Sequence, residues 1–376
     1  MKDRIYLDYN ASAPLHPEAL DAINIALSTP FAAHNASAVH HFGRKGRKII
    51  ETARENIANL IGTNVNQILL NSGATEGNNS VILHFSKTFP EDTILISAIE
   101  HPSIMEAADH IPNVKIIPVD NNGLLNLDAL ELMLQENKVC LVSCMYVNNE
   151  SGVIQDVSKI ANLTHQYNAL FHSDLTQAVG RIPLNVNGLG VDFITLSSHK
   201  IGGPQGVGAL ALGLCGQTPT LLFGGGQEKS ARAGTENVAG ISGFGAAALA
   251  ASKNLDNYQK LAALRDNLEE QLMKISPTLE IHARNAKRVA NTSFFSLPGT
   301  DSQTLLMALD LEGIAVSNGS ACSSGSIKAS TTLKAMGCDE KITNSALRIS
   351  MGWATKEDDI NAFITAWQKL CTRIQV

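Results

Sequence analysis

The sequence predicts an α/β protein with a large domain built on a mainly parallel sheet and a smaller α+β domain. Short apolar segments alternate with longer amphipathic ones through the first two thirds of the 376 residues, which is the pattern of βαβ units. Beyond about residue 255 a charged amphipathic segment begins and the alternation stops. Chains of this length commonly form two domains. We therefore expect a large domain over residues 16–255 and a small one from residues 1–15 and 256–376.

The expected elements follow from periodicity. Short runs rich in β-branched and aliphatic residues predict strands, at residues 67–71, 93–98, 114–118, 139–145, 169–173, 193–196 and 207–212. The amphipathic segments between them predict helices at residues 43–60, 76–85, 103–110, 127–136, 156–167 and 235–252. For the small domain we expect helices at residues 257–275, 302–311 and 361–374, with strands at residues 279–283, 289–296 and 346–350.

Composition excludes several classes of protein. Hydrophobic residues make up 44% and charged residues 17%, which is a globular and not a disordered composition. A net charge of −6 provides no basic surface, so we expect neither nucleic-acid nor membrane binding. No apolar stretch reaches the ~18 residues of a membrane span, and no signal peptide is visible, so we expect a cytoplasmic protein. Six cysteines without a C-x-x-C pair predict neither disulfides nor a metal site.

Lys200 is the first candidate for catalysis. It follows an apolar strand, next to the hydroxyls of Ser197 and Ser198 and ahead of a glycine turn. A lysine whose ammonium loses water there has a lowered pKa and can form an imine. The alternative is a solvated surface lysine at the end of a strand.

Asp174 stands at the end of another expected strand and is followed by Gln177. Open α/β sheets bind ligands at the carboxyl ends of their strands. An acid there could pair with the ring-nitrogen cation of a heteroaromatic cofactor. The alternative is that Asp174 caps a following helix.

The segment from Asn71 to Glu76 is a strand, a turn of small residues and a helix start. Free backbone N–H groups at such a turn, with the hydroxyl of Thr75, can bind a phosphate. The alternative is a capping box made by Ser72 or Thr75. A glycine-rich loop at residues 224–235 precedes the long expected helix.

Two further candidates, His101 and Asn149, also follow strands, although a lone histidine there is more often structural. Cys322 is different, since it lies within ten small or polar residues. That environment predicts an accessible loop on which a thiolate could reach a substrate. Cys140 and Cys144 are expected to pack in the core.

Together these segments resemble the cysteine desulfurases of the NifS/IscS type, in the class V aminotransferase family of pyridoxal-phosphate (PLP) enzymes. The resemblance covers nearly the whole chain and rests on Gly73-Ala-Thr-Glu, Val147-Asn-Asn-Glu, Ser197-x-His-Lys and Gly319-Ser-Ala-Cys. It implies the fold-type-I architecture of aspartate aminotransferase.

The resemblance also implies a role for each candidate. Lys200 would bind PLP covalently and move the substrate's α-proton, Asp174 would pair with the pyridinium nitrogen, and Gln177 would contact the phenolic oxygen. His101 would stack on the ring and assist proton transfer. The remaining implied contacts are Asn149 to the cofactor; Ala74, Thr75, Ser197 and His199 to its phosphate; Thr235 to the phosphate from the second subunit of a homodimer; and Asn35 and Arg348 to the substrate carboxylate.

The activity implied by the resemblance is removal of sulfur from L-cysteine. Alanine would be released, and a persulfide on Cys322, carried on a mobile loop at about residues 317–330, would pass to acceptor proteins such as an iron–sulfur scaffold or to a thiolation pathway. Alternatives are a selenocysteine lyase or a class V aminotransferase, which need the same lysine and aspartate. A non-catalytic scaffold that keeps the fold is a third.

Overall fold

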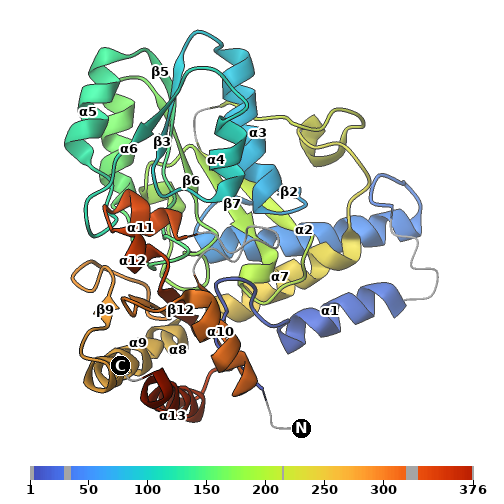
Figure 1. Cartoon of the computed structure of the whole chain (residues 1–376). Coiled ribbons are helices and arrows are strands. Elements are labelled where there is room, and N and C mark those ends of the chain that lie inside the picture. The colour runs from blue at the N-terminus through green and yellow to red at the C-terminus, as the bar shows by residue number, and fades with distance from the viewer. Residues whose placement is uncertain (1–3, 29–34, 214–215, 319–328, 375–376) are drawn as a thin grey trace.

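A seven-stranded sheet forms the centre of the computed structural model, which describes residues 4–28, 35–213, 216–318 and 329–374 (Figure 1). Its five strands β7, β6, β5, β3 and β4 are parallel, whereas β8 runs antiparallel between β2 and β7. This confirms the mainly parallel sheet. In spatial order the strands are β2 (Ile68–Asn71), β8 (Gly208–Leu212), β7 (Phe193–Ser197), β6 (Leu170–Asp174), β5 (Val139–Ser143), β3 (Thr93–Ser97) and β4 (Val114–Ile117).

Both faces of this sheet are buried, because neighbouring residues of a strand point to opposite sides. In β3, Ile94 and Ile96 belong to the core under α3 (Ala74–Thr88) and α4 (Pro102–Ala108), while Leu95 belongs to the core on the other face. That second face is covered by α2 (His41–Ile61), α5 (Leu127–Glu136), α6 (Val157–Gln166) and α7 (Val238–Lys253).

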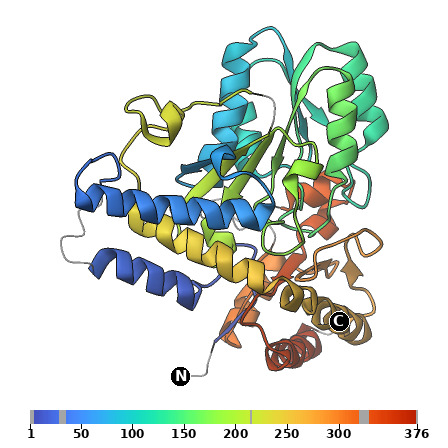
Figure 2. The same ribbon diagram turned by 180° about the vertical axis from the view of Figure 1, so that it is seen from behind.

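Three helices pack together below the sheet (Figure 2): α1 (Pro17–Ser28), α2 and α7. Small residues allow α2 and α7 to approach closely, since a Cβ added to Gly245 would lie only 2.5 Å from Cα of Ala53. The helix expected at residues 235–252 is present as α7, and most of its residues are buried. Helix α1 was not predicted from the sequence.

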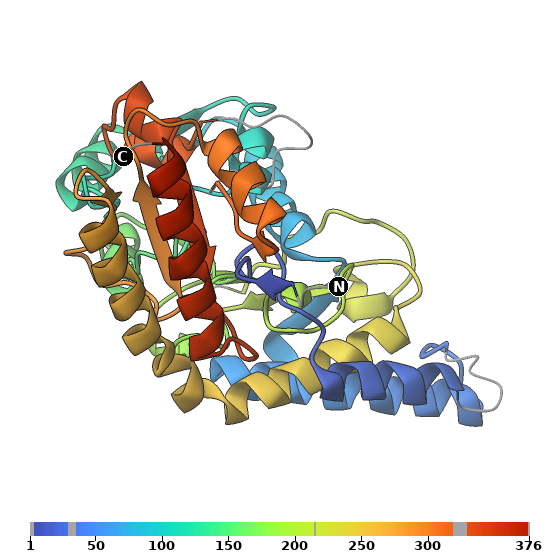
Figure 3. The ribbon, with the colours of Figure 1, turned by 60° about the horizontal axis from the view of Figure 1, so that its bottom comes forward.

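The second part of the chain forms its own sheet and core. Strands β9 (Glu280–Ile281), β10 (Thr292–Ser296) and β12 (Ala346–Ser350) are antiparallel, and β1 (Ile5–Tyr6) pairs in parallel with β11 (Ile314–Ala315). Two long helices, α9 (Leu261–Ile275) and α13 (Glu357–Ile374), lie side by side on this sheet (Figure 3). The shorter helices are α8 (Leu255–Gln259), α10 (Ser302–Leu311), α11 (Thr331–Ala335) and α12 (Glu340–Thr343).

The core of this second part contains Leu7 together with apolar side chains between Leu261 and Cys371. This composition supports our proposal that residues 1–15 and 256–376 form one domain and residues 16–255 the other. The prediction of one continuous helix at residues 257–275 is wrong, because this segment contains two helices: α8 ends at Gln259 and α9 begins at Leu261.

Four 3-10 turns complete the described elements: η1 (Val65–Gln67), η2 (Val186–Gly188), η3 (Ser198–Lys200) and η4 (Gln227–Ser230). Among the helices of the described segments, none combines the length and apolar character that crossing a bilayer requires. These same segments contain no group of three or more His, Cys, Asp or Glu side chains arranged for a metal ion.

Candidate active site

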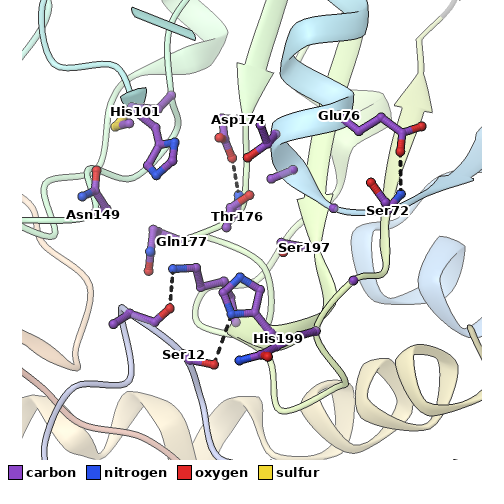
Figure 4. A pocket seen from close by; sticks show the side chains of 18 of the residues that line it. Ser12, Ser72, Glu76, His101, Asn149, Asp174, Thr176, Gln177, Ser197 and His199 are labelled. Carbon is purple, nitrogen blue, oxygen red and sulfur yellow. Dashed lines mark hydrogen bonds between the residues drawn. The ribbon is translucent and has the colours of Figure 1, made fainter. Parts of the chain in front are cut away.

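The parallel strands β3, β5, β6 and β7 end at one edge of the large sheet, and β2, which is parallel to β7 across β8, ends there too. A cavity of about 510 Å³ opens at this edge (Figure 4). Nine residues singled out in the sequence line it: Ala74, Thr75, His101, Asn149, Asp174, Gln177, Ser197, His199 and Lys200. The expectation that candidates after separate strands converge is therefore confirmed, whereas their individual roles stay predictions.

Lys200 ends the 3-10 turn η3 directly after β7. Its Nζ donates to the backbone oxygens of Asn10 and Ala11, at 2.5 and 2.8 Å. The side chain lines the cavity and is only partly exposed, so the alternative of a solvated surface lysine is wrong.

Asp174, the last residue of β6, is almost fully buried. One carboxylate oxygen accepts from the Asn78 side chain at 2.8 Å, and the other accepts from the backbone N–H of Thr176 at 2.8 Å. No helix follows in this described stretch, where residues 176–180 form turns, so the helix-cap alternative is wrong. Both oxygens of the Asp174 carboxylate are thus hydrogen-bonded, and the residue lines the cavity.

Two titratable groups beside Asp174 are held neutral. Burial, followed by the negative charge of Asp174, raises the pKa of Glu100 to about 8. Glu100 accepts from the backbone N–H of Met145 at 2.7 Å, whereas its Oε2 is without a partner among the described residues. Burial lowers the pKa of His172 to about 4, and its ring contacts hydroxyls on both sides. Glu100 and His172 are thus both uncharged at neutral pH beside Asp174.

The N-terminus of α3 faces the same cavity. Its cap residue is Gly73, with φ of 146°, and no side chain caps the helix, so the capping-box alternative is wrong. A Cβ at Gly73 would meet no atom within 4 Å. Helix N-termini leave N–H groups unpaired and attract anions. The turn therefore offers open space and donors suited to a phosphate.

His101 both caps a helix and lines the cavity. Its Nδ1 accepts from the backbone N–H of Ser103 at 3.1 Å at the start of α4, which confirms a structural role. Because Nδ1 accepts a hydrogen bond, the neutral ring carries its proton on Nε2. The ring is therefore available for proton exchange at Nε2 while Ser103 fixes its orientation.

His199 stands across the cavity from His101 in Figure 4. Burial, followed by the charge of Lys200, lowers its pKa to about 4, so the ring is neutral at pH 7. Its Nδ1 lies 3.2 Å from Oγ of Ser12.

The other expected site residues lie outside the lining of this cavity. Arg348 is buried and donates to Asp8 at 2.7 Å and to the backbone oxygen of Asn149 at 2.9 Å, while its Nε is without a partner among the described residues. Asn35 and Thr235 are exposed. Cys322 lies outside the described residues.

The chain on either side of residues 319–328 is anchored beside the site. Ser317 exchanges two backbone hydrogen bonds with Arg348. On the other side, Ser330 and Thr332 donate to the carboxylate of Glu150, at 2.5 and 2.9 Å. Both anchors are thus adjacent to Asn149, which lines the cavity.

The four cysteines in the described segments, unlike a reactive thiol, are buried or half-buried and have raised pKa values. Cys140 and Cys144 are buried in the core, as predicted. Burial raises the pKa of Cys140 to about 12 and also raises the pKa values of Cys144, Cys338 and Cys371. A thiol with a raised pKa supplies little thiolate at neutral pH.

Sequence reasoning missed Asn10 and Asn78. Asn10 is fully buried, and its backbone oxygen accepts from Lys200 and Gln177 while its side chain donates to Thr292. Asn78 lies one turn after Ala74 on α3 and donates to Asp174. An asparagine on a buried helix face was the available signal for Asn78; no local signal marked Asn10.

The sequence profile of the aminotransferase class-V family matches residues 5–363. The chain is 36% identical to the cysteine desulfurase IscS of Dictyoglomus turgidum over all of this chain and 96% of that protein, and 37% identical to a cysteine desulfurase of Sinorhizobium fredii over 95% and 94%. The X-ray structure of a NifS-like protein from Rickettsia africae superposes with a TM-score of 0.91 at 39% identity, covering 98% of this chain and 99% of that one.

The chain therefore belongs to the class-V aminotransferase family, whose fold it shares. Within that family it is a member of the cysteine desulfurase group of the IscS and NifS kind, as the resemblance in the sequence predicted.

Proposed function

We propose that the protein is a PLP-dependent cysteine desulfurase that converts L-cysteine to L-alanine and places the sulfur on Cys322. The observation that carries this proposal is the cavity, in which Lys200, a buried carboxylate at Asp174 and an uncapped helix N-terminus face one another. Those three features match the aldehyde, the pyridinium nitrogen and the phosphate of one cofactor.

The residues present fit PLP. Lys200 would hold it covalently through Nζ, and Asp174 would pair with the ring nitrogen. The phosphate would lie at the α3 N-terminus with Thr75, Ser197 and His199. Buried Oε1 of Gln177 and Oγ1 of Thr176 are without partners among the described residues, as is expected where a ligand completes a network. When bound, PLP supplies an electron sink for the pair released from the substrate's Cα–H bond.

Arg348 is suited to bind the substrate carboxylate. Its guanidinium is fixed by Asp8 and by the oxygen of Asn149, and Nε remains available as a donor. Charge-assisted hydrogen bonds from a fixed arginine are strong and directional. Exposed Asn35 would complete this contact.

Lys200 would take the α-proton of the bound substrate. His101, which carries a proton on Nε2 when neutral, would exchange protons with the substrate and with the thiol of Cys322. As a thiolate, Sγ of Cys322 attacks the substrate sulfur: the S–S bond forms, the Cβ–S bond breaks, and its electron pair and one proton remain with the carbon product. One alanine and one persulfide are thus formed for each L-cysteine and each Cys322 thiol consumed.

Along the chain, Cys322 is four residues from Asn318, which is next to the anchor Ser317. We infer that the persulfide is delivered to acceptor proteins such as an iron–sulfur scaffold. We further propose a cytoplasmic homodimer in which exposed Thr235 reaches the phosphate of the other subunit.

A single-turnover experiment tests the proposal. PLP-loaded wild type and Cys322→Ser are mixed with L-cysteine, and alanine and persulfide are measured. Both products should form in the wild type and neither in the variant. Cys338→Ser is the matched control, because that partly buried thiol has a raised pKa and should be dispensable. Alanine without Cys322 would indicate a lyase, a keto acid would indicate a transaminase, and a protein that binds no PLP would indicate a scaffold.

A further inference from the structure

The cofactor cavity contains an acidic side chain at the end where the phosphate is expected. Glu76 lines this cavity and is the third residue of α3, whose N-terminus faces the same space. Its Oε2 accepts from the backbone N–H of Ser72 at 3.0 Å (Figure 4). Although burial raises the pKa of Glu76, the hydrogen bonds from Arg232 and Ser72 lower it overall. The Glu76 carboxylate is therefore an anion at neutral pH.

The cavity lining offers little positive charge to a phosphate. Burial lowers the pKa of His199 to about 4, so this ring is neutral at pH 7. Lys200 is a cation, but its Nζ would be used by the aldehyde of PLP. Among the described residues of the lining there is no other Lys and no Arg. A phosphate at this end would therefore be repelled by Glu76 unless a charge outside the lining compensates that carboxylate.

Arg232 provides such a charge. Its Nε donates to Oε1 of Glu76 at 2.9 Å, and its Nη2 donates to Oε2 at 3.3 Å. A guanidinium binds a carboxylate most firmly through two such bonds. The side chains of Arg232 and Glu76 are 25% and 10% exposed, so solvent screens this pair only in part. Arg232 itself is outside the cavity lining, so it acts on the cavity through Glu76 and not by direct contact.

The backbone that leads to Arg232 is held in place. Residues 228–230 adopt left-handed backbone, with φ of 45°, 58° and 64°. This conformation is unfavourable for residues other than glycine and persists only where the surrounding contacts enforce it. Here Glu228 is bound to Arg54, and Ala231 is buried in the core under α3. Arg232 is thus presented to Glu76 from a segment that is attached to the large domain on its N-terminal side.

Glu76 also affects which backbone donors remain for a phosphate. It occupies the N–H of Ser72, and Oδ1 of Asn71 accepts from the N–H of Gly73 at 3.0 Å. The first N–H groups of a helix have no partner within the helix, so the donors left for an anion begin at residues 74–75. The carboxylate thus shapes the turn before α3, and its charge must be compensated if the same turn is to bind a phosphate.

We propose that Arg232 is a positioning residue for the cofactor phosphate. It neutralises the Glu76 carboxylate, so that the N-terminus of α3 can bind a dianion beside an acidic side chain. The inference rests on the proposed function, because PLP is the ligand that carries the phosphate. Without Arg232, the charge of Glu76 acts on the phosphate uncompensated, whereas the contacts of the cofactor ring and aldehyde with other residues remain.

Titrations of the full-length apoprotein with PLP and with pyridoxal test the proposal. Pyridoxal has the ring and the aldehyde but lacks the phosphate. Arg232→Met should weaken PLP binding by roughly fivefold or more and leave pyridoxal binding within about twofold of the wild type, because only the phosphate meets the uncompensated charge. Arg232→Lys keeps a charge and should retain more PLP affinity than Arg232→Met. Arg265→Met on α9, which removes an arginine bound to Asp266, is the control and should alter neither affinity.

A double variant separates neutralisation of Glu76 from mere attachment of the loop to α3. Arg232→Met/Glu76→Gln lacks both charges, so its PLP affinity should recover most of the loss seen in Arg232→Met. A double variant that binds PLP as weakly as Arg232→Met would overturn the proposal. Unchanged PLP affinity in Arg232→Met, or equal weakening of PLP and pyridoxal, would overturn it too. A wild type that binds neither ligand would contradict the proposed function as well, so the two failures are distinguishable.

Discussion

Replacing Glu100 by glutamine should change how the stability of the protein depends on pH. The carboxyl has a pKa of about 8 in the folded protein against an ordinary value of 4.5. Between those values the folded state keeps a proton that the unfolded state has lost, so the stability contributed by Glu100 falls as pH rises through this window. Within this window, Glu100 lowers the free energy of unfolding by about 1.4 kcal/mol for each unit of pH increase.

Glutamine resembles the protonated acid and does not ionise. The free energy of unfolding of Glu100→Gln minus that of the wild type should therefore rise by about 2.7 kcal/mol from pH 5.5 to 7.5. Urea unfolding of both proteins at several pH values measures this difference, and groups common to both cancel. Burial raises the pKa of Glu76, but hydrogen bonds from Arg232 and Ser72 outweigh it and lower the pKa overall. Glu76 is therefore ionised in both the folded and the unfolded state between pH 5.5 and 7.5. The difference in unfolding free energy between Glu76→Gln and the wild type should stay constant over this range, which makes Glu76→Gln the control. A constant difference for Glu100→Gln would refute the reasoning.

Three further predictions follow from buried polar groups. Asn78→Ala removes a donor to the Asp174 carboxylate, so PLP should bind at least about tenfold more weakly in a fluorescence titration, whereas unchanged affinity would contradict the proposed role of that carboxylate. Arg54→Met should cost about 3–5 kcal/mol in urea unfolding, because it leaves Glu228 buried and unpaired, and Arg54→Met/Glu228→Gln should recover part of that loss. Acidification from pH 6.5 to 4.5 should destabilise the wild type more than His172→Gln, since the folded His172 resists the proton that the unfolded chain binds; parallel curves would be the contrary result.

Local sequence patterns predicted the large sheet and the position of the site. Each strand is a short apolar run, and the residue that follows a parallel strand must lie at its carboxyl edge. Lys200, Asp174 and His101 could therefore be assigned to one place before their contacts were known. The antiparallel strand β8 does not change the position of the site. Because β8 is antiparallel to both β2 and β7, β2 runs in the same direction as β7 and ends at the same edge of the sheet.

Other features depend on partners that are distant in sequence. Asn10 bonds to Ser350, 340 residues away, and no pattern around either residue indicates the pairing. The glycine-rich loop at residues 224–235 was predicted only as a loop. In the structure its Glu228 is buried, bound to Arg54 and to the backbone N–H of Leu70, within a stretch of left-handed backbone. Charged residues in loops are usually solvated, so composition favoured the wrong environment for Glu228.

The pairing of β1 with β11 has a consequence for the order of folding during synthesis. All buried residues of the large core except Val289 have been made once α7 is complete. Asn10, whose backbone oxygen accepts a hydrogen bond from Lys200, is instead held by Ser350, Thr292 and Asn291. Contacts of such long sequence separation form late. The first residues translated are thus among the last to be fixed, and a nascent chain that ends before β12 would contain a folded sheet without a finished catalytic centre.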